Sequence, residues 1–190
     1  ASTWLSSDAG RSIFENSLPN DHDRLNDVYA AMTRHYDGAP IQRLAKRDPE
    51  THLTGQAREL FVKGAEVYGR EGHCVTCHQP DGTGLPAAQF PPLAKSEWVT
   101  GSAERLAKLV LHGITGPISV NGTKFPGTVP MVPFKHLSDD ELAAVLTYVR
   151  NAFGNRSSAV VPAQIKVIRS ATKGRVDLYT PDELLEAHPD

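Results

Sequence analysis

The stretch Cys74-Val-Thr-Cys-His78 holds both cysteines of the 190-residue chain and one of its eight histidines. Two residues separate the cysteines, and the histidine follows directly. This C-x-x-C-H pattern decides how the rest of the chain is interpreted, because each chemistry that uses paired thiols makes different demands on the surrounding sequence.

Three interpretations use only part of the pattern. A thioredoxin-like redox pair follows a strand in a βαβ unit, and the sequence predicts no strand before Cys74. A structural zinc site needs four nitrogen or sulfur ligands, and a second closely spaced cluster is missing. A disulfide between Cys74 and Cys77 would close a very short loop and would constrain little of the chain.

Covalent haem attachment uses all three residues at once. The thiols of Cys74 and Cys77 would each form a thioether with one haem vinyl group. His78, directly after them, would then become the proximal ligand of the iron. The motif therefore favours one haem c, bound covalently through the two cysteines.

The second axial ligand has several candidates. Met131 lies in a proline-stiffened stretch, Gly127-Thr-Val-Pro-Met-Val-Pro-Phe134, outside any helical stripe. A thioether ligand stabilises Fe(II) and suits electron transfer, so we predict His78 and Met131 as the iron ligands. The other methionine, Met32, falls in the apolar stripe of a predicted helix and is interpreted as core. The competing imidazoles are those of His73, His112 and His136.

Apolar periodicity predicts helices separated by long loops. The strongest pattern begins after Ser138, which forms a capping box with Glu141. The loops at 79–102 and 113–137 are longer than a compact domain usually tolerates, and a large buried cofactor would organise them. The predicted helices span 21–36, 56–70, 103–112, 139–153 and 181–188.

Bulk composition excludes several classes of function. The net charge is −2, which argues against a nucleic-acid partner. No apolar run is long enough to span a membrane, and no signal sequence is recognised. The chain starts at Ala1 without a methionine, so we expect a processed form or a piece of a longer protein.

Taken in order, these segments resemble the class I c-type cytochromes. They are similar above all to the bacterial monohaem domains that are fused to, or work beside, periplasmic dehydrogenases. The resemblance covers residues 56–155, with Met131-Val132-Pro133 in place of the commoner Met-Pro. The matching segments are GAEVY (64–68), CVTCH (74–78), FPPL (90–93), the Met131 loop and LAAVLTYVRNAFGN (142–155).

The resemblance implies an all-α class I cytochrome c fold, in which helix 56–70 crosses helix 139–153 near Gly64. It divides the chain into an N-terminal extension (1–55), a cytochrome c domain (56–155) and a C-terminal extension (156–190). It also implies that the backbone carbonyl of Pro92, or of Pro91, accepts a bond from the His78 ring. Trp98 would line the haem pocket, although an ordinary core role fits it at least as well.

The function implied is one-electron transfer by a low-spin haem, in an electron carrier or in the haem domain of a larger dehydrogenase. A gas-binding or sensory haem protein with a displaceable sixth ligand is the alternative. The chain is not predicted to be an enzyme, because no cluster of acid, base and nucleophile appears. Expected partners are a dehydrogenase donor and a terminal oxidase or another cytochrome as acceptor, in the periplasm or outside the cell.

Overall fold

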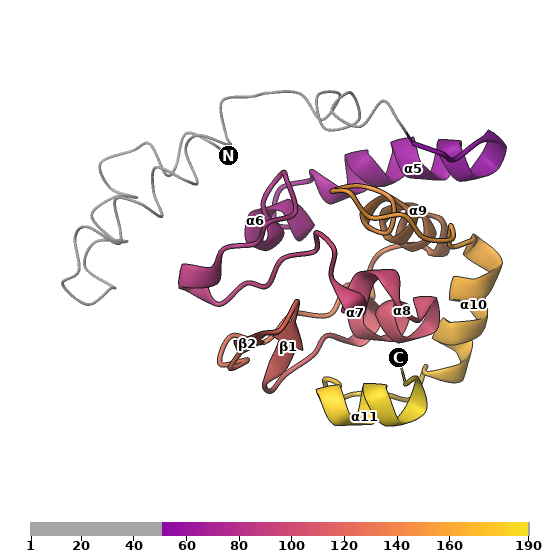
Figure 1. Cartoon of the computed structure of the whole chain (residues 1–190). Coiled ribbons are helices and arrows are strands. Elements are labelled where there is room, and N and C mark those ends of the chain that lie inside the picture. The colour runs from indigo at the N-terminus through magenta and orange to yellow at the C-terminus, as the bar shows by residue number, and fades with distance from the viewer. Residues whose placement is uncertain (1–50, 190) are drawn as a thin grey trace, which may run out of the picture. The chain divides into compact units, whose positions relative to one another are not determined.

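The computed structural model describes residues 51–189. The predicted helix 21–36, with Met32, lies outside the described residues. Helices form most of the regular structure (Figure 1). They are α5 (Gly55–Tyr68), α6 (Cys74–His78), η1 (Pro86–Ala88), α7 (Glu97–Thr100), α8 (Ala103–His112), α9 (Asp139–Val149), α10 (Pro162–Ala171) and α11 (Pro181–Ala187).

Helices α5 and α9 cross at Gly64, as predicted. A Cβ atom at this position would lie 2.0 Å from the carbonyl oxygen of Ala144, so only glycine permits this approach. Aromatic rings pack around the crossing. The ring centroid of Tyr148 lies 5.1 Å from that of Phe61 and 5.3 Å from that of Tyr68. The crossing therefore forms the centre of the core.

Helix α9 begins as its sequence predicts. The Ser138 hydroxyl accepts a hydrogen bond from the Glu141 amide, and the Glu141 carboxylate accepts one from the Ser138 amide. The helix ends at Val149, four residues before the predicted end at 153. The chain then turns through Phe153 and Gly154, both with positive φ.

The prediction of an all-α fold needs one correction. Strands β1 (Ile118–Val120) and β2 (Thr123–Phe125) form a two-stranded antiparallel sheet inside the loop that was predicted at 113–137. Asn121 and Gly122 form the turn between them, both with positive φ. A two-residue Asn-Gly turn of this kind matches the twist of a hairpin.

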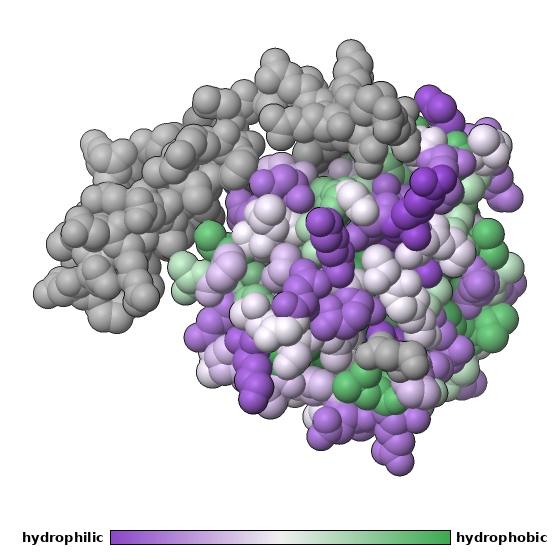
Figure 2. Space-filling view, in the orientation of Figure 1, coloured by the Kyte–Doolittle hydropathy of each residue, from purple (hydrophilic) through white to green (hydrophobic). Residues whose placement is uncertain are grey.

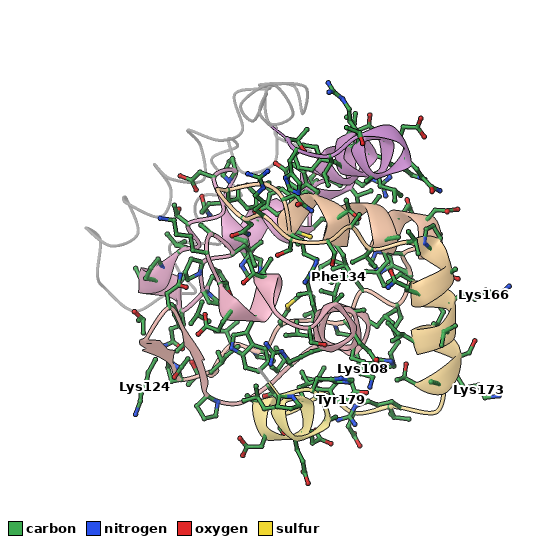
Figure 3. The ribbon with its side chains drawn as sticks, turned by 45° about the vertical axis from the view of Figure 1, so that its right-hand side comes forward. Lys108, Lys124, Phe134, Lys166, Lys173 and Tyr179 are labelled. Carbon is green, nitrogen blue, oxygen red and sulfur yellow. The ribbon has the colours of Figure 1, made fainter. Side chains whose placement is uncertain are left out.

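Residues 156–189 pack onto the helices that precede them (Figure 1). Helix α10, which was not predicted, lies on α8 and α9 and buries Ile165 and Ile168. Helix α11 lies on α8 and buries Leu184. Figure 3 shows Lys108 and Tyr179 on the side of α8 that faces α11. Thus α8 lies between earlier helices and the C-terminal segment.

The surface of the described part is mixed. Figure 2 shows hydrophilic side chains over most of the visible face, with hydrophobic residues in small groups. Among residues 51–189, no helix is long and apolar enough to cross a membrane.

Candidate haem-attachment site

The cysteine motif forms a helix of five residues, α6, with His73 as its N-cap. Cys74 and Cys77 are three residues apart on this turn, so their side chains lie on one face. Both thiols are free rather than joined as a disulfide. Burial raises the pKa of Cys74 to about 12 and also raises the pKa of Cys77, which keeps both sulfurs in the neutral thiol form.

The imidazole of His78 is fixed by one hydrogen bond. Its Nδ1 lies 2.9 Å from the carbonyl oxygen of Pro91. A carbonyl can only accept, so Nδ1 carries the proton and Nε2 keeps a free lone pair. Burial lowers the pKa of His78, which favours this neutral form. A neutral ring anchored through Nδ1 is how histidines are usually oriented toward a metal.

The carbonyl is that of Pro91, the second of the two residues predicted for this role, and not that of Pro92. The loop geometry explains the difference. Gly84 has φ +71°, and a Cβ there would lie 2.6 Å from the Pro91 carbonyl. The Gly84 amide in turn bonds to the His78 carbonyl at 3.1 Å. Gly84 thus lets the two segments approach each other with Pro91 facing the ring.

The loop after α6 is organised mainly by its own backbone. Leu85 and Phe90 exchange two hydrogen bonds, and the carbonyl of Gly82 accepts from Leu93 and Ala94. Asn155, which follows α9, was not predicted as a site residue. Its side chain donates to the carbonyls of Leu93 and Val149 and accepts from the Lys95 amide at 2.7 Å. This asparagine ties the Pro91 loop to the end of α9.

Met131 is half-buried and lies in a bridge rather than a free loop. Its amide donates to the Ile114 carbonyl at 2.9 Å, and its carbonyl accepts from the Ile114 amide at 3.1 Å. Phe134 follows Met131 by three residues. Its ring centroid lies 5.5 Å from that of His73, the residue directly before Cys74. The Met131 loop therefore reaches the attachment turn. The pairing of Met131 with His78 on one iron stays a prediction.

The competing histidines have other contacts. His112 is 5% exposed, and its Nε2 lies 2.8 Å from the hydroxyl of Thr172. His73 and His136 pack edge to face, with ring centroids 5.6 Å apart. The Thr172 contact occupies one ring nitrogen of His112, whereas ring packing alone does not occupy the nitrogens of His73 and His136. The choice of Met131 over these histidines stays a prediction.

Trp98 is 7% exposed and packs at the junction of α7 and the hairpin. Its indole donates to the Ser119 carbonyl at 2.9 Å, and the guanidinium of Arg105 lies 5.0 Å from its ring centroid. These contacts describe a core tryptophan. Its role as a wall of a haem pocket stays a prediction.

The donor set fits a covalently bound haem. One helical turn offers two free thiols and an imidazole whose Nε2 is available. The Oγ1 atom of Thr76 and the Nδ1 atom of His73, on the same turn and beside it, are buried without a hydrogen-bond partner in the described part of the chain. Buried polar atoms of this kind are uncommon in proteins and need an explanation, and a bound cofactor is one that fits their place beside the thiols.

Comparisons with known proteins agree with this geometry. A family model described as cytochrome c matches residues 61–153. Cytochrome c-552 of Thermus thermophilus is 41% identical over 107 residues, which are 54% of this chain and 68% of the relative. The cytochrome c subunit of a quinone alcohol dehydrogenase from Gluconobacter oxydans is 40% identical over 157 residues.

That second match covers 73% of this chain but 32% of the subunit. The cytochrome subunit of a fructose dehydrogenase from Gluconobacter japonicus is 29% identical over 112 residues, 58% of this chain and 22% of the relative. The chain thus corresponds to most of a small cytochrome, and to about a third or less of these dehydrogenase subunits.

Proposed function

The chain belongs to the cytochrome c family, whose members are electron carriers rather than catalytic enzymes, and we propose that it carries single electrons on one haem c. Cys74 and Cys77 hold the haem as thioethers, and His78 and Met131 bind the iron. The observation that carries the proposal is the His78–Pro91 hydrogen bond, on the same turn as two free thiols. The haem supplies a one-electron Fe(III)/Fe(II) couple.

The protein's contribution is to orient the ligands and limit the access of water. The Pro91 carbonyl fixes the plane of the His78 ring and leaves Nε2 free for the iron. The bridge to Ile114 holds the backbone of Met131 from both its amide and its carbonyl. If His78 and Met131 both held the iron, neither oxygen nor another substrate would have a free place on it.

The relatives support a proposal for the partners, and attachment chemistry supports one for the compartment. Several of them are named as cytochrome subunits of dehydrogenases that act on alcohol, fructose or gluconate. We propose that this chain accepts electrons from a dehydrogenase and passes them to a terminal oxidase or another cytochrome. Covalent attachment of haem c takes place outside the bacterial cytoplasm, so the proposed location is the periplasm or the exterior.

Absorption spectra of the oxidised and reduced protein test the ligand set. His/Met ligation predicts a two-banded reduced spectrum and a weak near-infrared sulfur-to-iron band in the oxidised form. Met131→Ala should remove that band, whereas Met32→Ala, the matched change at the other methionine, should keep it. Wild type without the band would rule out Met131 as ligand, and rapid CO binding would then favour the gas-binding alternative.

A further inference from the structure

Three extended segments lie side by side next to the end of α8. Ile114 pairs antiparallel with Met131 on one edge and parallel with Tyr179 on the other. The Tyr179 amide donates to the Gly113 carbonyl at 3.0 Å, and the Tyr179 carbonyl accepts from the Thr115 amide at 2.9 Å. The strand that holds Met131 is thus itself held by the C-terminal segment.

The middle segment, which contains Gly113 and Ile114, has no space for an additional side chain at Gly113. A Cβ atom on Gly113 would lie 2.4 Å from the Met131 carbonyl oxygen and 2.7 Å from Cδ2 of Leu178. The glycine has φ +76°, a conformation that side chains rarely adopt. Gly113 thus lies between the Met131 backbone and the Leu178 side chain, at a distance that leaves no space for a side chain of its own.

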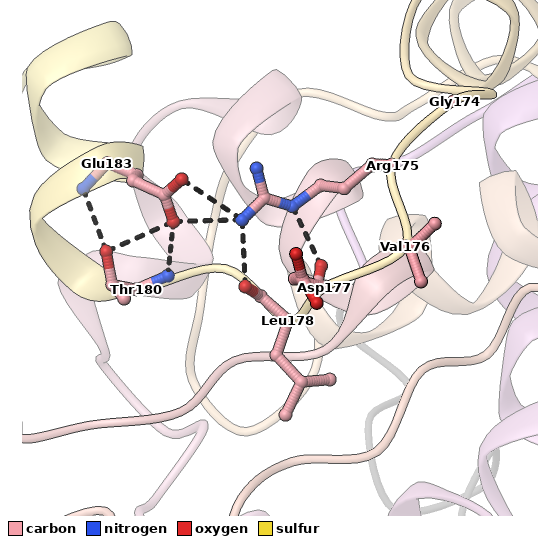
Figure 4. A pocket seen from close by; sticks show the side chains of 7 residues that line it. All are labelled: Gly174, Arg175, Val176, Asp177, Leu178, Thr180 and Glu183. Carbon is pink, nitrogen blue, oxygen red and sulfur yellow. Dashed lines mark hydrogen bonds and ion pairs between the residues drawn. The ribbon is translucent and has the colours of Figure 1, made fainter.

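Arg175 fixes the shape of the C-terminal segment (Figure 4). Its Nη2 donates to the Leu178 carbonyl at 2.8 Å and to a carboxylate oxygen of Glu183 at 2.9 Å. Its Nε donates to the Asp177 carbonyl at 2.9 Å. The guanidinium carbon also lies 3.6 Å from the centroid of the Tyr179 ring. A single side chain therefore holds a turn of the backbone and one face of the tyrosine.

The Tyr179 ring is 9% exposed and has a second neighbour. The imidazole of His112 meets it edge to face at 5.7 Å, and Nε2 of that imidazole bonds to Thr172 at the end of α10. The tyrosine is thus enclosed by Arg175 on one side and by the last residue of α8 on the other. These two ring contacts and the backbone bonds to Gly113 and Thr115 together hold Tyr179 beside Ile114.

We infer that Arg175 and Tyr179 are positioning residues for Met131, and that residues 175–179 hold Met131 on the iron by supporting Ile114. This inference rests on the proposed function, because it requires Met131 to be an iron ligand. An external ligand can bind the iron only after the Met131 sulfur has left it, and a Met131 segment that opens more often releases the sulfur more readily. Opening costs more when the strand beneath it is paired on both edges, so the segment should slow and weaken that exchange.

The test is imidazole binding to the oxidised haem protein, measured by loss of the sulfur-to-iron band. Tyr179→Ala and Arg175→Ala should each raise the association constant for imidazole by about tenfold, because they raise the population of the open segment. Tyr179→Phe keeps the ring and should bind imidazole as the wild type does. The band should persist in all three variants when imidazole is absent.

Ile165→Ala is the stability control, since Ile165 is 0% exposed on α10 but has no part in the bridge. It should lower the unfolding midpoint without changing imidazole affinity. Equal affinity in Tyr179→Ala and wild type, with the band present in both, would overturn this inference alone. A rise of the same size in Ile165→Ala would also overturn it. Absence of the band from the wild type would overturn the ligand assignment as well.

Discussion

Gly64 of α5 and Ala144 of α9 approach so closely that a Cβ atom on the glycine would stand 2.0 Å from the alanine carbonyl oxygen. The obstacle is backbone in the middle of a helix, which cannot turn aside as a side chain can. The close packing of two helices about eighty residues apart in the sequence therefore requires that residue 64 have no side-chain methyl group.

Gly64→Ala should lower the free energy of unfolding by about 3 kcal/mol, since it forces the two helices apart in a packed core. Denaturant titration of the haem protein measures the change. Gly174→Ala is the matched control, because nothing lies within 4 Å of a Cβ at that position. Similar losses in the two variants would contradict a specific role for the crossing.

Tyr68 should stabilise the turn that follows His78. Its hydroxyl donates to the Gln79 carbonyl at 2.5 Å. Burial, with Cys74 nearby, raises the pKa of Tyr68 well above 10, so the donor proton is retained. Tyr68→Phe should lower the free energy of unfolding by about 1 kcal/mol, seen as a lower denaturant midpoint at unchanged slope. An unchanged midpoint would show that the bond contributes nothing.

Acid should weaken the start of α9. The hydrogen bond from Arg70, and then those from Ser138, lower the pKa of Glu141 to about 2 from its ordinary 4.5. A carboxyl with a depressed pKa adds stability that is complete above pH 4.5 and is lost as the pH falls toward 2. The pair is exposed and screened, so the contribution should be below about 1 kcal/mol.

Glu141→Gln should remove this part of the pH dependence, measured as the unfolding midpoint from pH 5 to pH 2. Asp140→Asn changes a carboxylate of the same helical turn and serves as the control for charge at the helix start. A pH profile altered as much by Asp140→Asn as by Glu141→Gln would show that the ion pair is not the cause.

A second pH effect should come from His112. Burial, and then the cations Lys135, Arg175 and Arg169, lower the pKa of this imidazole from 6.5. The unfolded chain thus binds a proton at this histidine near pH 6.5, whereas the folded chain does not. The free energy of unfolding therefore falls as the pH drops below 6.5. Above that pH the effect disappears.

His112→Phe should flatten the stability profile between pH 7 and pH 5 relative to the wild type, because it removes the group that titrates. His52→Phe, at an exposed histidine, should leave the wild-type slope in place. Unfolding midpoints of the wild type and of both variants, measured at several pH values, test this expectation. A slope unchanged by His112→Phe would assign the effect to other groups.

The sequence predicted those parts of the fold whose signals are local. The capping box at Ser138 and the apolar stripe of α9 correspond to an observed helix, and the predicted helix 181–188 corresponds to α11. Helix 103–112 has the predicted bounds. Helix α10 was missed although Pro162 stands at its first turn, because only Ile165 and Ile168 face inward and its apolar stripe is short.

The hairpin was missed for a different reason. Its strands have three residues each, too few to show alternation, and Asn121-Gly122 was the one available signal. Within the site, the motif indicated the thiols and His78, but the choice between Pro91 and Pro92 depends on how Gly84 brings two loops together. Contacts of this kind, like that of Asn155 with Leu93, exist only after the chain has folded.

The crossing of α5 with α9 also has a consequence for a chain that is made from its N-terminus. Until residues 139–149 have been synthesised, the side of α5 that carries Gly64 has no helix to pack against, and the core cannot form. Cys74 and Cys77 come directly after α5, so during that interval their thiols belong to an open chain. Both sulfur atoms are partly enclosed in the completed fold, so they are more accessible to chemical modification before α5 and α9 meet.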